Sequence, residues 1–351
     1  MKKSSIIIFL LALFTIPLYS LDLTEGRIKI VIHEDSGSFS AYYLEDINSG
    51  KYIPFLFDKD PETSFLSIMI DNKILKMGNS SVFSKDVYIT STGGKIVWES
   101  TVLKVVEEFS FVKSRSSSLS DGFKITITIE NISDQNKIIG LSYLFDTYLG
   151  EDNDDHFLLD SGASVSSEKS FSTNFPNFWI SPSSDNNFLG LQGMVRGPGI
   201  TVPDKIIFAN WKRLQDNLWN FQVKKNRNFN LIPYSINDSA VSVIYDPIKV
   251  SRKSKREVVI VMGAYNNSSF KGSSLIEESG IDSLFDQTIN IDSDPQNTET
   301  SIKSDLIATT DLLKKIDSFI QFPDNVTDGE IDLIVQILET LKQRQKLYEN
   351  R

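Results

Sequence analysis

The sequence predicts a mainly β protein: a large antiparallel β-sandwich followed by a C-terminal α-helical hairpin. Short runs of β-branched and aromatic residues, separated by Gly, Asn, Asp and Ser, fill residues 21–265, and such runs are typical of antiparallel strands. No helical period interrupts them, so two stacked sheets are favoured over a fold with crossover helices. Beyond residue 303 the apolar residues recur every three or four positions, which indicates amphipathic helices.

The N-terminal segment has the three-part layout of a secretory signal peptide. Lys2 and Lys3 give it a basic start, an apolar run follows from Ile6 to Ile16, and Pro17 precedes the small residue Ser20. The apolar run is too short to cross a hydrocarbon core roughly 30 Å thick as a helix. We therefore expect residues 1–20 to be cleaved and the mature chain to be exported without a membrane span. The periplasm is the expected destination, with the cell surface or the medium as alternatives.

The chain contains no cysteine and has a formal net charge of −10. An exported protein without disulfides depends on its own hydrophobic core, and thiol nucleophiles and cysteine-based metal sites are excluded. The acidic charge disfavours nucleic acid as a partner, because basic surfaces gain affinity by releasing counterions from phosphates. Protein, glycan and cation partners remain.

Strands are expected throughout the sandwich. The segment from Phe123 to Glu130 alternates strictly between apolar and polar residues, so it predicts a strand with one buried and one wet face. Asp71-Asn72-Lys73 and Gly93-Gly94 have the spacing of hairpin turns. The remaining strands are expected at residues 27–33, 39–47, 51–57, 65–70, 74–77, 87–91, 96–112, 138–145, 189–195, 206–211, 219–223, 240–245 and 256–263.

The C-terminal part divides into a linker and a helical hairpin. Residues 266–303 are rich in Ser, Asp, Asn and Thr, and we interpret them as a solvated linker. Residues 304–351 form the predicted hairpin. Two narrow apolar stripes that face only each other bury little area, so a third surface is needed: the sandwich, another protein or a second copy of the chain. The residues expected to contact a partner are Leu306, Leu313, Ile316, Ile331, Leu338 and Leu341.

The most distinctive acidic stretch follows the predicted strand at residues 138–145. Its carboxylates would repel one another if brought together, and a hard cation such as Ca²⁺, with about six to eight oxygen ligands, would relieve that repulsion. The alternative is an exposed loop in which water screens the charges. Asp146, Glu151 and Asp154 also suit the carboxylate pair of a glycosidase. The candidate calcium ligands are Asp146, Glu151, Asp152, Asp154 and Asp155.

Three tryptophans form a second candidate site, for carbohydrate. Trp179, Trp211 and Trp219 occur near Asn, Arg and Asp residues, and an aromatic face next to polar groups can stack on a sugar and hydrogen-bond it. The alternative is core packing, because the large apolar area of Trp dominates packing. Exposure of all three rings beside a groove would favour sugar binding, and burial of all three would argue against it.

Histidine-based catalysis is not indicated. The chain has two histidines, His33 and His156, and neither is accompanied by a Gly-x-Ser-x-Gly turn or another recognisable nucleophile. We therefore assign no catalytic residue, and calcium is the sole cofactor considered.

Three segments of the sequence resemble parts of exported bacterial β-sandwich proteins of unknown function, particularly from spirochaetes. They run from Leu144 to Asp152, from Pro203 to Trp211 and from Asn237 to Val241. The resemblance spans about residues 140–265 and implies a periplasmic sandwich. The habitat of these proteins also makes the flagellar motor one candidate assembly. No catalytic or binding residue follows from the resemblance.

These observations favour a non-enzymatic periplasmic protein that docks onto an envelope protein assembly through its sheet face and its helices. The first alternative is a carbohydrate-binding or sugar-processing sandwich protein, which rests on the tryptophans. The second is a calcium-stabilised surface adhesin, for which bound calcium would raise the melting temperature.

Overall fold

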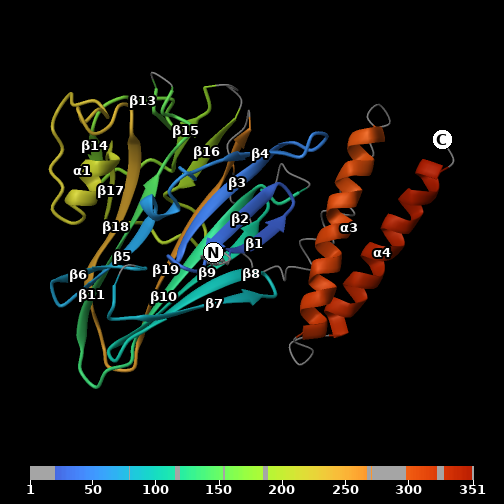
Figure 1. The fold of residues 1–351 in the computed structure, drawn as a ribbon, viewed down its shortest axis with the longest axis horizontal. Helices are drawn as coiled ribbons and strands as arrows, with labels where there is room; N and C mark the ends of the chain where they lie inside the picture. Colours follow the sequence, from blue (N-terminus) through green and yellow to red (C-terminus); the bar gives the residue numbers. More distant parts are fainter. Residues whose placement is uncertain are drawn as a thin grey trace, which may run out of the picture.

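A computed structural model of the chain describes residues 20–78, 80–114, 119–152, 155–184, 189–266, 270, 298–321 and 328–349. Within these ranges two large antiparallel sheets, a smaller N-terminal sheet and two C-terminal helices are present (Figure 1). This architecture confirms the predicted mainly β fold with a large antiparallel sandwich and C-terminal helices. The predicted signal peptide lies outside the described residues except for Ser20, where the first strand begins.

The largest sheet has nine strands in the order β13-β12-β15-β16-β19-β10-β9-β8-β7. Every pairing in it is antiparallel. Its strands are β7 (Ser84–Thr90), β8 (Gly93–Glu99), β9 (Leu103–Val112), β10 (Gly122–Asn131), β12 (Phe157–Leu159), β13 (Ser164–Val165), β15 (Phe178–Pro182), β16 (Leu189–Met194) and β19 (Lys255–Asn266).

The second sheet has six strands in the order β14-β17-β18-β11-β5-β6, and the N-terminal sheet has four in the order β1-β2-β3-β4. The six are β5 (Phe65–Ile70), β6 (Lys73–Lys76), β11 (Lys137–Asp146), β14 (Lys169–Phe171), β17 (Lys205–Asn210) and β18 (Ser239–Val250). The four are β1 (Ser20–Glu25), β2 (Ile28–His33), β3 (Ser38–Asp46) and β4 (Lys51–Pro54).

The core lies between the facing sheets and follows the alternation of the sequence. On β10, Phe123, Ile125 and Ile127 are fully buried, whereas the residues between them are half-buried on the other face. Tyr143 and Phe145 of β11 bring stacked rings into the same core cluster from the opposite sheet, with centroids 4.3 Å apart. Burial of such large apolar side chains, at roughly 25 cal/mol per Å² of apolar surface, is the main stabilising term of the fold.

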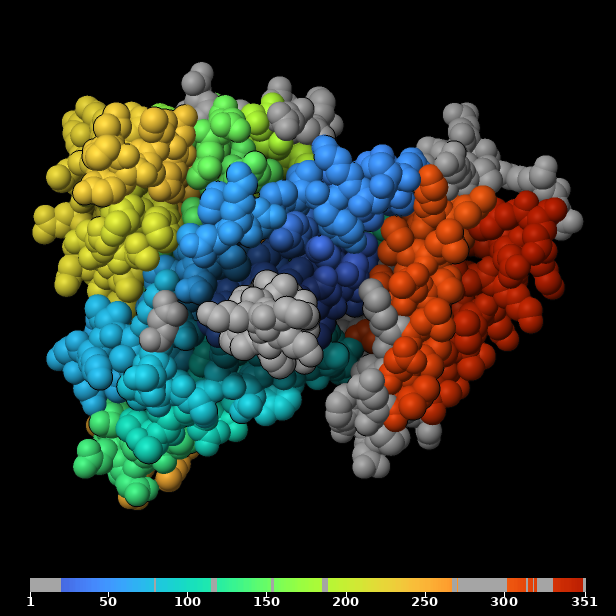
Figure 2. All heavy atoms as spheres, in the orientation of Figure 1, coloured from blue at the N-terminus to red at the C-terminus, as the bar shows by residue number. Residues whose placement is uncertain are grey.

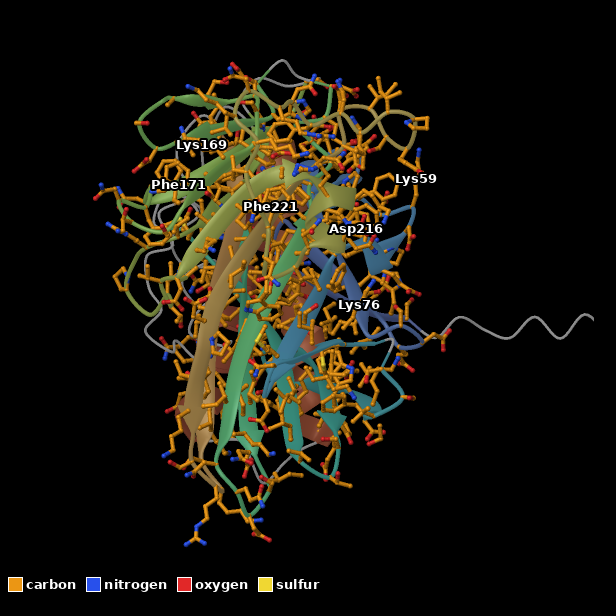
Figure 3. All side chains as sticks on the ribbon, turned by 90° about the vertical axis from the view of Figure 1, so that its left-hand side faces the viewer. Lys59, Lys76, Lys169, Phe171, Asp216 and Phe221 are labelled. Carbon is orange, nitrogen blue, oxygen red and sulfur yellow. The ribbon has the colours of Figure 1, made fainter. Side chains whose placement is uncertain are left out.

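One end of the outer face of the six-stranded sheet is covered by helix α1 (Trp211–Asp216) and the loop after it. The Asn210 side chain caps α1 by accepting a bond from the Arg213 N–H. Leu214 and Phe221 pack against Leu144 of the sheet, and Phe221 is labelled in the view onto this sheet (Figure 3). The strand predicted at residues 219–223 is therefore wrong: this apolar segment is a loop that covers the sheet.

The C-terminal helices are α3 (Thr298–Gln321) and α4 (Asp328–Glu349), so the hairpin begins before the predicted residue 304. Leu312, Ile316 and Ile337 belong to the cluster that packs between the two helices. The predicted linker lies largely outside the described residues. None of the described helices is long and apolar enough to span a membrane.

Helix α3 lies against the sandwich, while α4 lies on the outer side of α3 (Figure 2). The N–H of Gly26 donates a 2.9 Å hydrogen bond to the Asp311 carboxylate, and the Lys315 ammonium donates to the Ser91 carbonyl. The sequence left three possible surfaces for the hairpin: the sandwich, another protein or a second copy of the chain. The structure shows contact with the sandwich. Among the six predicted partner residues, Ile316 and Leu341 pack between the helices, and Leu306, Leu313, Ile331 and Leu338 are exposed.

Candidate carboxylate site

Three carboxylates meet at one end of the six-stranded sheet. One side-chain oxygen each from Asp146, Glu151 and Asp238 lies within 4.8 Å of the others, and among the described residues no other group of three potential metal ligands is this close. Asp146 is the last residue of β11, Glu151 lies in the following turn and Asp238 immediately precedes β18. Because β11 and β18 pair with Asp146 opposite Ala240, the strand ends bring these residues together.

Asp146 is the buried member, with 4% of its surface exposed. Its backbone N–H donates a 2.9 Å hydrogen bond to the Ser64 hydroxyl, whereas its Oδ1 has no hydrogen-bond partner in the described part of the chain. Burial raises the pKa of Asp146 to about 8; a hydrogen bond from the Thr63 hydroxyl opposes this, and the nearby Asp238 and Asp60 carboxylates add to it. Burial therefore favours the protonated form of this side chain.

Glu151 and Asp238 are half-buried at the more open side of the cluster. Burial, followed by the charges of Asp146 and Asp238, raises the pKa of Glu151 to about 8, although the Ser239 N–H hydrogen bond opposes the shift. Burial also raises the pKa of Asp238, and a hydrogen bond from Ser235 opposes it. Burial thus raises the pKa of all three carboxyl groups, and a carboxyl group whose pKa lies near neutral can both donate and accept protons.

Aromatic side chains border the same strand ends. The indole N–H of Trp211 donates a 2.8 Å hydrogen bond to the carbonyl of Thr63, next to Ser64. Trp219 packs in the same cluster as Trp211, and both rings are half-buried. Tyr148 is 37% exposed, and its carbonyl accepts the N–H of Glu151. Aromatic faces and carboxylates therefore occupy one edge of the sandwich.

Of the other predicted ligands, the described residues Asp152 and Asp155 do not belong to this group of three carboxylates. Asp152 and Asp155 are exposed, and Asp155 accepts a hydrogen bond from Ser164. Asp154 lies outside the described residues. Sequence reasoning missed Asp238, because nothing in the sequence gives the register that pairs β18 with β11. The one available signal was an acidic residue directly before an apolar run at residues 240–245.

Trp179 does not belong to the aromatic edge. It is 1% exposed and packs edge-on against Phe157 and Phe208, with ring centroids 5.9 and 6.2 Å away. A Cβ atom at Gly193 would lie only 2.3 Å from its ring, so glycine is required there for the indole to fit. The predicted sugar contact of Trp179 is corrected to a core position, since neither ring face meets solvent.

No family model matches the sequence, and no curated protein matches it. Solved structures do match. A galactose mutarotase related enzyme from Lactobacillus acidophilus is 8% identical, with 72% of this chain and 99% of that chain covered and a TM-score of 0.46. A galactose mutarotase-like protein from Lactobacillus casei is 8% identical over 70% and 100%, with a TM-score of 0.41. An aldose epimerase homologue from C. elegans is 9% identical over 71% and 99%, with a TM-score of 0.40.

These matches contradict the main prediction from the sequence, a non-enzymatic protein docking onto an envelope assembly. The three solved structures reported above are named as galactose mutarotase or aldose epimerase relatives, and none of them is named for an envelope assembly. The first alternative from the sequence, a carbohydrate-binding or sugar-processing sandwich protein, agrees better with them. At this level of similarity they supply no site or substrate for this chain, so the function is argued below from its own residues.

Proposed function

We propose that this chain is a carbohydrate-binding, sugar-processing β-sandwich protein whose site is the cluster of Asp146, Glu151 and Asp238. The observation that carries the proposal is the meeting of these three carboxyl groups within 4.8 Å at an edge bordered by Trp211 and Trp219. Carboxyl groups hydrogen-bond sugar hydroxyls, and aromatic rings present apolar faces to the CH groups of a sugar.

The protonation of the cluster suits acid–base chemistry at an anomeric carbon. A protonated carboxyl such as Glu151 can donate its proton to the ring oxygen, while a neighbouring carboxylate accepts the proton of the anomeric hydroxyl. The bond between the anomeric carbon and the ring oxygen then breaks, and reclosure returns both protons. Carboxyl groups this close leave no room for the water that inverting glycosidases place between residues about 6.5–9.5 Å apart. Proton transfer is therefore favoured over inverting hydrolysis.

Access to the cluster is from the side of Glu151 and Asp238, since Asp146 is buried beneath them. Tyr148 is exposed, its carbonyl accepts the Glu151 N–H, and its ring lies 6.5 Å from that of the half-buried Phe57. A sugar entering here would meet Glu151 first and an aromatic face next to it. We assign Glu151 and Asp238 to contact with the sugar. Asp146 is buried, and we assign it no contact with the sugar; its protonation state sets the net charge of the cluster.

The proposal is tested by titrating a panel of monosaccharides and oligosaccharides into the protein and by following anomer interconversion by polarimetry. We expect saturable binding of at least one sugar and a rate above the buffer rate, both lost in Glu151→Gln and kept in the exposed-surface control Glu99→Gln. If no sugar binds, and Ca²⁺ instead raises the melting temperature of the wild type but not of Glu151→Gln, the calcium alternative replaces this proposal.

We also propose export to the periplasm, where envelope glycans would be available as ligands. The support is the basic start at Lys2 and Lys3 followed by the apolar run from Ile6 to Ile16. Cell fractionation and N-terminal sequencing test this. A mature N-terminus near residue 21 in the periplasmic fraction is expected, and full-length chain in the cytoplasm would contradict it.

A further inference from the structure

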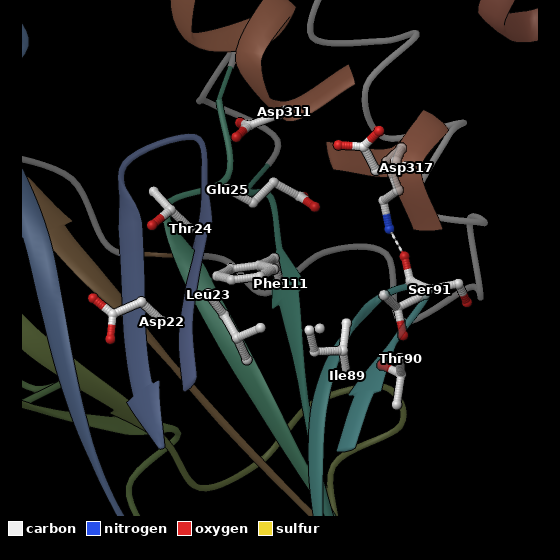
Figure 4. A pocket seen from close by; sticks show the side chains of 13 residues that line it. Asp22, Leu23, Thr24, Glu25, Ile89, Thr90, Ser91, Phe111, Asp311 and Asp317 are labelled. Carbon is white, nitrogen blue, oxygen red and sulfur yellow. Dashed lines mark hydrogen bonds between the residues drawn. The ribbon is translucent and has the colours of Figure 1, made fainter. Parts of the chain in front are cut away.

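The cavity between strand β1, the β7–β8 hairpin and helix α3 belongs to the contact between the sandwich and the helices (Figure 4). It has a volume of about 290 Å³, and Glu25 and Asp311 line it. Both carboxylates are buried and already accept hydrogen bonds, Glu25 from the Ser120 hydroxyl at 2.8 Å and Asp311 from the Gly26 N–H at 2.9 Å. These two carboxylates are therefore used in packing the chain against itself.

The turn at residues 231–236 carries three large apolar side chains that the described residues leave uncovered. Ile232, Tyr234 and Ile236 are 76%, 78% and 73% exposed, and among the described residues they are the three most exposed large apolar side chains. Single exposed apolar residues are normal, but several gathered in one loop indicate an interaction site. The turn is therefore a candidate binding surface.

Backbone hydrogen bonds and a buried anchor hold this turn in one conformation. Leu231 and Ser235 pair through N–H···O bonds in both directions, at 2.9 and 3.0 Å, so that residues 232–234 form the tip. Phe229, which precedes the turn, belongs to the main core cluster, and its carbonyl accepts a 2.9 Å hydrogen bond from the Asn210 side chain. A turn fixed in this way loses little conformational entropy when it binds a ligand.

The same turn is bonded directly to the carboxylate cluster. The Ser235 hydroxyl donates a hydrogen bond to the Asp238 carboxylate and accepts one of 2.9 Å from the Asn210 side chain. Asn210 also donates to the Asp238 carbonyl at 3.1 Å. Because Tyr234 immediately precedes Ser235, a ligand that contacts Asp238 has the apolar tip of the turn next to it.

Side-chain amides at the base of the turn supply polar donors. The Oδ1 of Asn230 accepts the Asn237 N–H at 2.6 Å, and the Oδ1 of Asn228 accepts the Asn230 N–H at 3.3 Å. These bonds orient the amides of Asn228 and Asn230 and leave their NH₂ groups without a partner among the described residues. Donors beside an aromatic face match a sugar unit, which presents hydroxyl groups at its rim and CH groups on its faces.

We propose that the turn at residues 231–236 is a second subsite of the carboxylate cluster, so that the ligand is an oligosaccharide. This inference rests on the proposed function and names its substrate class. One sugar unit with a free anomeric hydroxyl occupies the cluster at Glu151 and Asp238, and the next unit packs on the Tyr234 ring and accepts a hydrogen bond from the Asn230 amide. A membrane surface fits the turn less well, because the net charge of −10 disfavours approach to anionic lipid.

Calorimetric titration with two sugar series tests the proposal: glucose, cellobiose and cellotriose, and N-acetylglucosamine, chitobiose and chitotriose. In the wild type we expect affinity to rise about tenfold from monosaccharide to disaccharide in at least one series, because the second unit packs on an aromatic ring. Tyr234→Ala should lose that gain, and Tyr234→Trp should keep it, since Trp restores an aromatic face. Tyr88→Ala is the matched control, because Tyr88 is an exposed tyrosine on β7 of the nine-stranded sheet.

Failure of this inference and failure of the proposed function give different results. Equal affinity for monosaccharides and disaccharides in the wild type, or an undiminished gain in Tyr234→Ala, would overturn the second subsite and leave the proposed function in place. If no sugar of either series binds, the proposed function fails and this inference fails with it. Cosedimentation with vesicles of phosphatidylethanolamine and phosphatidylglycerol that is lost in Tyr234→Ala would assign the turn to a lipid surface and overturn the proposal.

Discussion

The hydroxyl of Tyr143 donates a 2.7 Å hydrogen bond to the carboxyl of Glu107 inside the sandwich core. Glu107 comes from β9 and Tyr143 from β11, so the bond joins the two large sheets. Glu107 is 1% exposed, and burial raises its pKa to about 8, with the Tyr143 hydrogen bond opposing the shift. The core thus contains a carboxyl group that is neutral at physiological pH.

Because of the Glu107 carboxyl, we expect the stability of the protein to fall as the pH rises. Its folded pKa lies above the unfolded value of about 4.3, so the folded state binds more protons between about pH 4.3 and pH 8, and its stabilising contribution is lost across that window. Glu107→Gln keeps an acceptor for Tyr143 and cannot ionise. We expect it to raise the free energy of unfolding at pH 8 by on the order of 2 kcal/mol and to flatten the pH dependence. Urea unfolding from pH 5 to pH 8.5 measures both.

The control for that experiment is Glu108→Gln, because Glu108 is the half-buried neighbour on the other face of β9. It should leave the pH dependence of stability unchanged. A Glu107→Gln variant that is less stable than wild type at pH 8 would show that the carboxyl is ionised and paired in the core, contrary to this account.

Phe270 is predicted to anchor the chain after the last strand. It is 2% exposed, and its backbone N–H and carbonyl both bond the Gln192 side chain, at 2.8 and 2.7 Å. The glycines at 122 and 263 make room for its ring, since a Cβ at either would lie 2.5 Å from it. Phe270→Ala should cost about 3 kcal/mol of stability. Tyr234→Ala, at a residue 78% exposed, should change it by no more than about 0.5 kcal/mol; equal losses would contradict the anchoring role.

The helical hairpin should open when its buried ion pair is broken. Asp305 of α3 is 7% exposed and accepts hydrogen bonds from Arg344 and Tyr348 of α4, both at 2.7 Å. Arg344→Met leaves that carboxylate without its charged partner, at a cost of about 3 kcal/mol. We expect faster limited proteolysis of α4 in this variant than in wild type. In the control variant Lys342→Met, which changes an exposed residue, α4 should be cleaved at the wild-type rate. Equal cleavage rates in the two variants would refute the pairing.

The features that depend on the local spacing of apolar residues could be predicted from the sequence. The alternation from Phe123 to Glu130 specifies a half-buried strand, and the recurrence of apolar residues after 303 specifies the helices. Long-range features could not be predicted. Asp238 joins Asp146 only through the β11–β18 register. The Trp179 ring is buried because Gly193, its partner on the neighbouring strand β16, leaves space for it. The segment at 219–223 has the composition of a strand but covers a sheet whose face would otherwise be exposed.

The most direct test of the central claim is calorimetric titration of the best-binding sugar into wild type, Glu151→Gln and Glu99→Gln. Hydrogen bonds to charged groups are worth about 1.5–3 kcal/mol, so Glu151→Gln should weaken binding roughly tenfold to a hundredfold. Glu99→Gln should bind as the wild type does. Unchanged affinity in Glu151→Gln, with saturable binding in the wild type, would place the sugar elsewhere and contradict the account.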